Sequence, residues 1–214
     1  MPRLSDTTRA QRREHILTSA WRCFSRNGFH ATSMDDIIAA TGMSSSAVYR
    51  YFRSKEQIIR ASAEKGVAGV RDIYAALLDR DPCPDPAETL TLLMAELHRR
   101  TDNPDYDITR IALQTWAETL RDPVLHHRAR QLYVDALEHI AELAQRWRDN
   151  GYLPPDADTN AVAATLLSTM YGLVVMHHVV DDVPAHTLRT GLALLGAATR
   201  TPPPTRPPGT QTAP

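Results

Sequence analysis

The sequence predicts an all-α protein of about nine helices. Two observations support this fold class. Apolar residues recur at three- and four-residue steps along almost the whole chain, as on one face of a helix, and no stretch reads as a convincing strand. Ser, Asp, Pro and Gly stand where these patterns begin and end, as expected of helix caps and stops. Apolar residues make up 43% of 214 residues, which is ample for a buried core.

Charge divides the chain into two parts. Residues 1–60 hold ten Lys and Arg against five Asp and Glu, whereas residues 61–199 hold twelve against twenty. A basic first part on an acidic body predicts a polyanionic partner for the first part only. Cys23 lies in a helical pattern and Cys83 in a Pro-rich loop, so no disulfide framework is expected. The N-terminus lacks the apolar core of a signal peptide, and we expect a cytoplasmic protein.

The first helix is expected over residues 8–27, where an inward apolar stripe is formed by Ile16, Leu17, Ala20 and Phe24. Gly28 is a stop signal, and Phe29 can fold back onto the helix end. Arginines crowd the other sides of this helix: Arg9, Arg12, Arg13, Arg22 and Arg26. The pattern predicts one face on a small core and a basic surface elsewhere.

Residues 32–55 have the outline of a helix-turn-helix. Thr32 or Ser33 can cap the first short helix, Asp36 is placed for a capping box with Ser33, and Gly42 can end the helix at positive φ. Ser44 can cap a second helix with one apolar face. Its other face carries hydrogen-bonding groups and a cation, on Ser45, Ser46, Tyr49 and Arg50. This polar face is suited to reading DNA.

The rest of the chain is helical in pattern. A long helix is expected from Ser54 to about Leu78, with Ser54 and Gln57 spaced as a second capping box. The Pro-rich residues 81–86 interrupt the pattern. Further helices are expected at 87–100, 107–120, 123–149, 159–180 and from Pro184 onward. Six prolines in residues 200–214 predict a disordered tail.

The stretch 159–180 has 22 residues without a formal charge. A membrane span is the less favoured interpretation, because the stretch contains Asn160, Gly172 and the pair His177–His178 and has acidic residues at both ends. A helix buried on most sides is favoured, and pairing with a symmetry-related copy would remove its surface from water. The interface residues expected in this helix and the next are Leu166, Met170, Leu173, Leu188, Leu192 and Leu195.

About 50 N-terminal residues carry a family pattern. It runs through Ile16-Leu17, Ala20, Phe24, Gly28-Phe29, Thr32, Ile37, Ala40, Gly42, Ser44, Val48-Tyr49, Tyr51-Phe52 and Lys55-Glu56. In this order the residues resemble the tetracycline-repressor (TetR) family of bacterial transcription regulators. Ser46 departs from the pattern, since many members have Gly there, and its hydroxyl could alter base preference. The phrase around Trp116, with Glu118, Asp122 and Pro123, is a weaker similarity.

The resemblance implies a helix-turn-helix DNA-binding domain at 1–54, a helical effector-binding and dimerisation domain at 55–199, and the tail at 200–214. It implies a homodimer that places two recognition helices in successive major grooves of a palindromic double-stranded DNA operator. Carried over by position, the residues near base edges are Ser44, Ser45, Ser46 and Arg50, and those near phosphates are Thr32, Ser33, Tyr49 and Lys55. Arg3, Arg9 and Arg12 are further candidates.

The resemblance also implies a small-molecule effector that releases a repressor from DNA. Inward-facing residues with a polar group are the pocket candidates: Met94, His98, Tyr106, Trp116, Tyr133 and His177. Because the apolar patterns contain no basic residue, they favour a neutral or cationic compound over a phosphorylated one.

A helix-turn-helix protein without effector control is the main alternative. The pairs His126–His127 and His177–His178 suggest a metal, but adjacent helical residues point about 100° apart and cannot easily chelate one ion. No nucleophile elbow, phosphate loop or HExxH motif is present, so we expect no enzyme and no cofactor.

Overall fold

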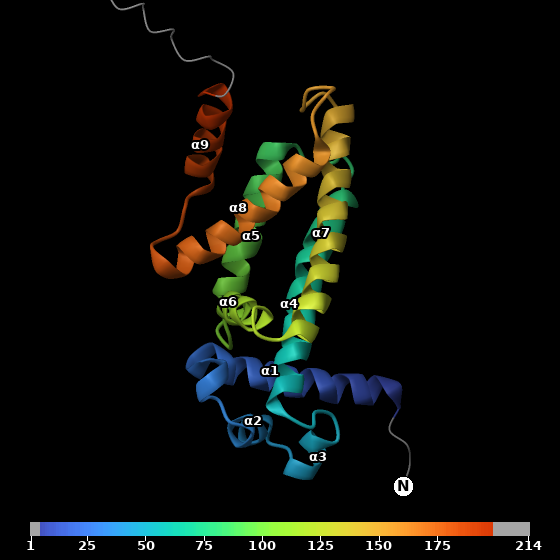
Figure 1. Cartoon of the computed structure of the whole chain (residues 1–214), viewed down its shortest axis with the longest axis vertical. Coiled ribbons are helices and arrows are strands. Elements are labelled where there is room, and N and C mark those ends of the chain that lie inside the picture. Colours follow the sequence, from blue (N-terminus) through green and yellow to red (C-terminus); the bar gives the residue numbers. More distant parts are fainter. Residues whose placement is uncertain (1–4, 199–214) are drawn as a thin grey trace, which may run out of the picture. The chain divides into compact units, whose positions relative to one another are not determined.

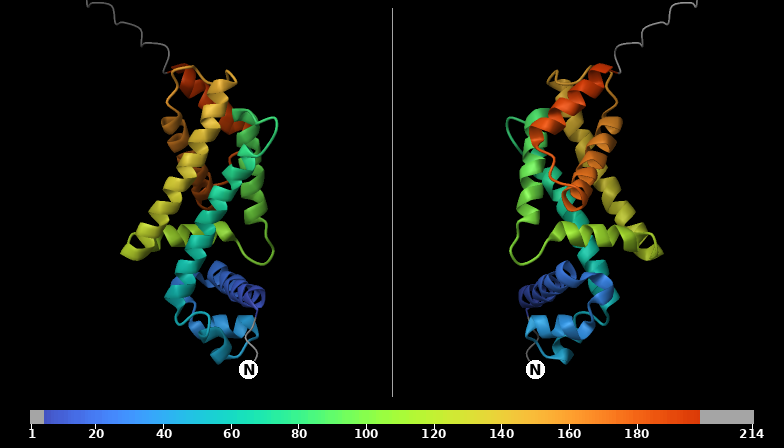
Figure 2. Two further views of the ribbon diagram at one scale, coloured as in Figure 1. Left: turned by 90° about the vertical axis from the view of Figure 1, so that its right-hand side faces the viewer. Right: turned by 90° about the vertical axis from the view of Figure 1, so that its left-hand side faces the viewer.

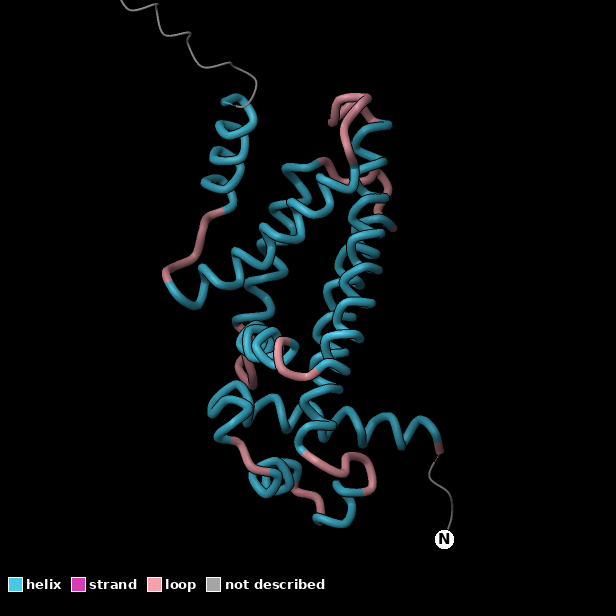
Figure 3. Tube along the Cα trace, viewed as in Figure 1, coloured by secondary structure: helices cyan, strands magenta, loops and turns pink. Residues whose placement is uncertain are grey.

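The computed structural model describes residues 5–198, and within them it contains nine α-helices and no strand (Figure 1). The all-α prediction is therefore confirmed. Figure 3 shows these helices with the loops that join them. The bounds are α1 Asp6–Ala31, α2 Met34–Thr41, α3 Ser45–Tyr49, α4 Lys55–Leu78, α5 Pro86–Thr101, α6 Ile108–Thr119, α7 Pro123–Asp149, α8 Thr159–Val179 and α9 Ala185–Ala198. The tail predicted to be disordered lies outside the described residues.

The chain separates into two compact units, Met1–Asp182 and Val183–Pro214. Among the described residues, the first unit holds α1 to α8 and the second holds α9. In α9, Leu188 and Leu192 are partly exposed and Leu194 is 66% exposed. The side chain of Leu195 lies outside the described part of the chain.

Helices α1, α2 and α3 enclose the first of two hydrophobic cores in the first unit. Ile16, Phe24, Ile37, Val48 and Phe52 are buried there. This core is not closed by the three helices alone, because Ile58 and Ala61 of α4 and Ile111 of α6 complete it. A core this thin depends on such neighbours for its stability.

Local signals set the helix ends in this region. The backbone leaves helical geometry at Gly28, where φ is +80°, and Phe29 packs edge-on against Phe24 with ring centroids 4.7 Å apart. The capping box at the start of α2 is formed: Ser33 Oγ accepts from Asp36 N at 3.0 Å, and Asp36 Oδ2 accepts from Ser33 N at 2.8 Å. Gly42 ends α2 with φ +64°. These predictions are confirmed.

The second predicted capping box, between Ser54 and Gln57, is wrong. The Ser54 side chain makes no capping bond to the backbone of α4. Gln57 Oε1 instead accepts from the backbone N–H of Arg53, at 2.8 Å. Glutamine thus reaches one residue further back than the box requires, and it satisfies a donor outside the helix.

The long helices α4 and α7 lie side by side, and α8 packs on α7 (Figure 2). Between them is the second core, whose largest buried side chains include Tyr74, Ile140, Leu143, Trp147 and Leu167. The regular three- and four-residue spacing of apolar residues on each helix builds this core. Trp147 Nε1 donates to Pro84 O at 2.8 Å and so ties the Pro-rich loop to the bundle.

Helix α6 contributes Ile111 to the first core and packs against the helices that form the second core. It contacts α1 on one side and α4, α5, α7 and α8 on the others. Asp107 begins the helix by accepting from Thr109 N at 2.9 Å and from Arg110 N at 3.2 Å. We call α1 to α3 the N-terminal module and α4, α5, α7 and α8 the body. The position of α6 makes it the structural link between the two.

Helix α8 is long and apolar enough to cross a membrane by length and composition alone. One face of it is buried in the protein, through Ala163, Leu167, Met170 and Val174. The opposite side is exposed. An apolar helix with one buried face and one exposed face is typical of a helix that packs in a protein core and leaves its other face to a partner. A span surrounded by lipid would be apolar and exposed on all sides.

Candidate functional site

The exposed face of α3 brings the predicted base-reading residues together. Ser44, Ser45, Ser46 and Arg50 are exposed, and Tyr49 is 44% exposed. Val48 and Phe52 anchor the opposite face in the core, at 0% and 2% exposure. The buried face of α3 is therefore held by the core, and its exposed face presents hydroxyl groups and a guanidinium to solvent. Ser44 Oγ lies 3.3 Å from Ser46 Oγ and makes no cap to the backbone.

The start of α2 is arranged differently from the prediction. Thr32 is 1% exposed, and its hydroxyl donates to Gly28 O at 2.7 Å, so this side chain is not free to hold a phosphate. Ser33 is exposed, but its hydroxyl and N–H both bond Asp36 Oδ2. Those bonds lower the pKa of Asp36, which keeps a negative charge at the site. A phosphate role for this helix start therefore depends on displacing Asp36.

Lys55 caps the end of α1. Its ammonium donates to Phe29 O and to Thr32 O, each at 2.8 Å. A cation at a helix C-terminus is favourable, because the last carbonyls of a helix have no intrahelical donors. The structure thus gives Lys55 a structural use that the sequence did not suggest. Its assignment to a DNA phosphate stays a prediction.

Free cations gather at the N-terminal module. Among residues 5–198, eight exposed arginines make no ion pair. Two of them are Arg130 of α7 and Arg189 of α9, and the other six lie in α1 or next to α3: Arg9, Arg12, Arg13, Arg26, Arg50 and Arg53. Arginines of the body are more often paired, as Arg60 is with Asp122 at 2.7 Å and Arg128 with Glu64. Unpaired cations on one module are typical of a polyanion-binding surface. Arg3 lies outside the described residues.

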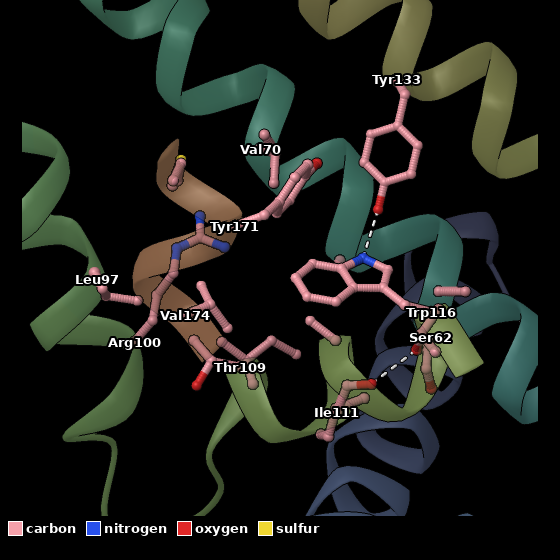
Figure 4. Close-up of a pocket in the computed structure, with 16 residues that line it drawn as sticks. Ser62, Val70, Leu97, Arg100, Thr109, Ile111, Trp116, Tyr133, Tyr171 and Val174 are labelled. Carbon is pink, nitrogen blue, oxygen red and sulfur yellow. Dashed lines mark hydrogen bonds between the residues drawn. The ribbon is translucent and has the colours of Figure 1, made fainter. Parts of the chain in front are cut away.

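The first unit also contains an apolar pocket enclosed by five helices (Figure 4). Its wall is formed by Ser62, Ala63, Gly66 and Val70 of α4, Leu97 and Arg100 of α5, Ile108, Thr109, Ile111, Ala112, Thr115 and Trp116 of α6, Tyr133 of α7, and Met170, Tyr171 and Val174 of α8. The cavity volume is about 60 Å³. Ligand pockets usually measure roughly 300–1,000 Å³. In this conformation the cavity is therefore too small for a ligand of the usual size.

Three aromatic residues form one side of the pocket. Trp116 Nε1 donates to the Tyr133 hydroxyl at 2.7 Å, and the Trp116 and Tyr171 rings pack edge to face, with centroids 4.8 Å apart. The Tyr171 hydroxyl is buried without a hydrogen-bond partner among the described residues. Burial and the neighbouring Tyr133 raise the pKa of Tyr171, so its hydroxyl stays neutral. An unpaired buried hydroxyl is costly and is a group that a ligand can satisfy.

Arg100 is the one charged side chain in the pocket wall among the described residues. It is 20% exposed, and its Nε donates to Glu96 Oε1 at 2.7 Å. Its Nη2 lies 3.2 Å from Gly69 O. This position overturns the premise that no basic residue lies among the inward-facing positions, and with it the preference for a neutral or cationic effector.

The pocket contains two of the six residues predicted for it, Trp116 and Tyr133. Met94 is 4% exposed but is not in the wall. Tyr106 packs on Trp21, with centroids 5.2 Å apart. His98 and His177 lie outside the pocket wall, and both contact the carboxylate of Asp182. His98 Nε2 is 3.7 Å from Asp182 Oδ2, and His177 Nδ1 is 2.6 Å from Asp182 Oδ1.

Arg100 and Tyr171 were missed, although their spacing carried a signal. Arg100 follows Leu93 and Leu97 at steps of four and three residues, which continues an inward stripe. Tyr171 lies four residues after Leu167 and three before Val174, on the buried face of α8. Each of these two polar residues continues an apolar stripe, which shows that it faces inward but not which inward space it enters.

The predicted dimer residues do not all face outward. Met170 and Leu173 are 8% and 9% exposed, and Met170 accepts from the Tyr74 hydroxyl at 3.5 Å inside the second core. These two are therefore unavailable to a partner, and Leu166 is half-buried. The exposed side of α8 instead carries Ala161, Ala164, Ser168, Gly172, Val175, Met176 and Val179.

Comparisons with known proteins agree with this arrangement. Residues 16–62 match the family model for bacterial regulatory proteins of the tetR family, and residues 86–201 match the model for the C-terminal part of BetI-type transcriptional repressors. The HTH-type transcriptional regulator UidR of Escherichia coli K12 is 26% identical over 166 residues, covering 76% of this chain and 79% of UidR. The HTH-type transcriptional repressor Rv1474c of Mycobacterium tuberculosis is 27% identical over 124 residues, covering 55% of this chain and 63% of the relative.

Solved structures share the fold. GusR of Salmonella enterica is 27% identical with a TM-score of 0.66, over 86% of this chain and 95% of GusR. A transcriptional regulator from Saccharomonospora viridis, solved in complex with choline, is 24% identical with a TM-score of 0.68, over 87% of this chain and 95% of that protein. FadR of Bacillus subtilis, solved with stearoyl-CoA, has a TM-score of 0.63 at 18% identity, over 85% of this chain and 96% of FadR.

Proposed function

The chain belongs to the TetR family of helix-turn-helix transcriptional regulators, and from this premise we propose that it is a cytoplasmic homodimeric repressor. The dimer binds a palindromic operator and leaves it when a small molecule enters the pocket between α4 and α8. The observation that carries this proposal is the position of α6. Its residues line the pocket, and Ile111 of the same helix belongs to the core of the N-terminal module.

DNA recognition rests on the exposed face of α3. Arg50 can pair bidentately with guanine in the major groove, and the hydroxyls of Ser45 and Ser46 can bond base edges or backbone. Tyr49 contacts a phosphate, as do the unpaired cations of α1. One five-residue helix reaches only a few base pairs, so a dimer is needed to make the site specific.

Dimerisation rests on the exposed side of α8. Small residues such as Ala164, Ser168 and Gly172 allow two helices to approach closely, and Val175 and Val179 add apolar area, with Val179 73% exposed. A two-fold axis would place this face against its own copy, which is how isologous interfaces bury an apolar surface. Leu188 and Leu192 of α9 are proposed to extend the interface.

Effector binding must enlarge the pocket, because the cavity of about 60 Å³ is too small for most ligands. Expansion displaces α4, α6 or α8. Ser62 of α4 lies in the pocket wall, and its hydroxyl accepts from Trp21 Nε1 of α1 at 2.8 Å. A shift of α4 at the pocket wall therefore moves α1 through the Trp21–Ser62 hydrogen bond, and α1 orients α2 and α3. A ligand acts through such a change only by its preference for the expanded state.

Footprinting of the purified protein on the DNA upstream of its own gene tests DNA recognition. We expect a protected palindrome, with affinity that falls steeply as salt rises. Arg50→Ala should cost about 1–3 kcal/mol and relax the specificity at one base pair. Arg130→Ala is the matched control, because Arg130 is also exposed and unpaired among the described residues but lies on α7. Equal losses for both variants would contradict the assignment of α3 as the reading helix.

A DNA-binding protein without effector control is the second candidate, and the small cavity favours it. Thermal unfolding in the presence of a compound library separates the two. A compound that raises the melting temperature and also releases the operator supports effector control. Stable operator binding in the presence of every compound that binds the body would favour the second candidate.

A further inference from the structure

We propose that the effector is a compact apolar carboxylic acid, with its carboxylate on the guanidinium of Arg100 and its apolar part against Trp116 and Tyr171. The inference names the ligand class of the pocket and rests on the proposed effector control. It is carried by the charge balance at Arg100, the space that surrounds its guanidinium and the composition of the pocket wall.

The charge on Arg100 is only partly neutralised. Its ion-pair partner Glu96 also accepts from Arg99 Nε at 2.7 Å, so one carboxylate serves two guanidinium groups. Arg99 is 70% exposed and solvated, whereas Arg100 is 20% exposed. The trio of Glu96, Arg99 and Arg100 therefore retains one positive charge. The part of that charge least screened by water is the one on the pocket wall.

Gly69 provides the space for the Arg100 head group. A Cβ atom at position 69 would lie 3.2 Å from Arg100 Nη1 and 3.4 Å from Nη2, closer than most side-chain contacts. The carbonyl of the same glycine lies 3.2 Å from Nη2. The Arg100 guanidinium is thus held by the carboxylate of Glu96 and by the backbone at Gly69. A fixed guanidinium binds a carboxylate better than a mobile one does, because less side-chain entropy is lost.

The remainder of the pocket wall is mostly apolar and uncharged, and its polar groups are the hydroxyls of Ser, Thr and Tyr residues and the indole N–H of Trp116. Figure 4 shows Trp116 across the space from Arg100, with Tyr171 and Val174 between them. Among the described residues, the pocket wall contains no Asp or Glu. A cationic ligand would therefore meet a guanidinium and no carboxylate, whereas an acid has a charge partner and an apolar surface for its body. Ligand charge should decide binding more than ligand shape does.

Thermal shift and calorimetry on the full chain test this with three matched probes: phenylacetate, its neutral amide, and choline. We expect phenylacetate to raise the melting temperature and the other two to leave it unchanged. Arg100→Met should weaken phenylacetate binding by about tenfold to a hundredfold, the usual worth of a hydrogen bond to a charged group. Arg99→Met, at the exposed arginine on the same carboxylate, leaves Glu96 to Arg100 alone and should weaken phenylacetate binding, but less than Arg100→Met does. Arg100→Lys retains the charge, so it should bind phenylacetate more tightly than Arg100→Met does and less tightly than the wild type does.

Three outcomes overturn the inference: choline or the amide stabilises the protein more than the acid, Arg100→Met binds the acid as wild type does, or neither phenylacetate nor a short aliphatic acid binds. Melting curves without ligand show that each variant is folded. Operator binding is measured separately. Acid binding through Arg100 without operator release would uphold the ligand class and contradict effector control, whereas loss of the footprint alone concerns DNA recognition.

Discussion

Gln114 of α6 holds the backbone of Phe29 at the end of α1. Its Oε1 accepts from Phe29 N at 2.7 Å, and its Nε2 donates to Phe24 O at 3.3 Å. The Gln114 side-chain amide therefore bonds both a backbone N–H and a backbone carbonyl at the end of α1. Gly28 leaves room for this contact, since a Cβ there would lie 3.2 Å from Gln114 Oε1. Ile111 and Trp116 of the same helix line the pocket. The pocket wall and the end of α1 are therefore joined through one helix.

Replacing Gln114 by Leu should loosen the end of α1. The change leaves the half-buried Phe29 N–H without its acceptor, which costs about 1–3 kcal/mol. Hydrogen exchange should show faster exchange of the Phe29 amide, and operator affinity should fall because α1 supports α2 and α3. Gln131→Leu, at an exposed position on α7, is the control. Unchanged exchange at Phe29 in the Gln114 variant would rule out a role for this contact.

The sequence predicted features that depend on neighbouring residues. The nine helices of residues 5–198, the stop at Gly28 and the capping box of Ser33 and Asp36 follow from spacing and backbone preference, which act locally. The pocket could not be predicted in the same way. Periodicity shows that Met94 faces inward, but it does not show which of several inward spaces the side chain enters. That choice depends on how the five helices pack.

The polar residues show the same limit. Lys55 looked suited to a phosphate because it lies in the first turn of α4, where a cation is unfavourable. The structure resolves the penalty with carbonyls from α1, 23 and 26 residues away in sequence. Asp182 likewise collects His98 and His177 from two helices. Contacts at such separations leave no periodic signal.

Ser33→Ala and Ser44→Ala should affect different properties of the protein, the first its stability and the second its operator binding. Ser33 caps α2, so Ser33→Ala should lower the free energy of unfolding by about 0.5–2 kcal/mol. Ser44 makes no cap to the backbone of α3, so Ser44→Ala should leave stability nearly unchanged and weaken operator binding. Urea unfolding and operator titration of both variants check this. A stability loss for Ser44→Ala equal to that of Ser33→Ala would show that Ser44 is a structural residue.

Gly69→Ala should separate stability from ligand affinity. Alanine in a helix interior is favoured over glycine by roughly 0.8–1 kcal/mol, and the flexible end of Arg100 can move away from the added methyl group. We therefore expect a higher melting temperature without ligand and weaker phenylacetate binding. Gly66→Ala on the same helix, whose added Cβ meets no atom within 4 Å, controls for the stability gain alone, because Gly66 itself lies in the pocket wall. An unchanged phenylacetate affinity in Gly69→Ala would show that Arg100 is not held by Gly69.

His178 should make the protein less stable as pH falls. Burial lowers the pKa of His178, with His177 and Arg110 acting in the same direction and Asp107 and Asp182 opposing it. Its Nε2 lies 2.7 Å from Thr109 Oγ1, on the pocket wall. The unfolded chain, with an ordinary histidine pKa of about 6.5, binds the proton more readily than the folded chain does. The free energy of unfolding therefore drops as pH falls below that value.

Urea unfolding between pH 5 and pH 8 measures this dependence. His178→Gln should flatten the part of the curve just below the ordinary histidine pKa, because glutamine keeps a polar group near Thr109 but does not titrate. His127→Gln, at an exposed histidine of α7, should leave the curve as it is in the wild type. If both variants reproduce the wild-type slope, the acid sensitivity arises elsewhere. If His178→Gln steepens the slope, protonation of His178 stabilises the folded chain, and the burial argument for this residue is wrong.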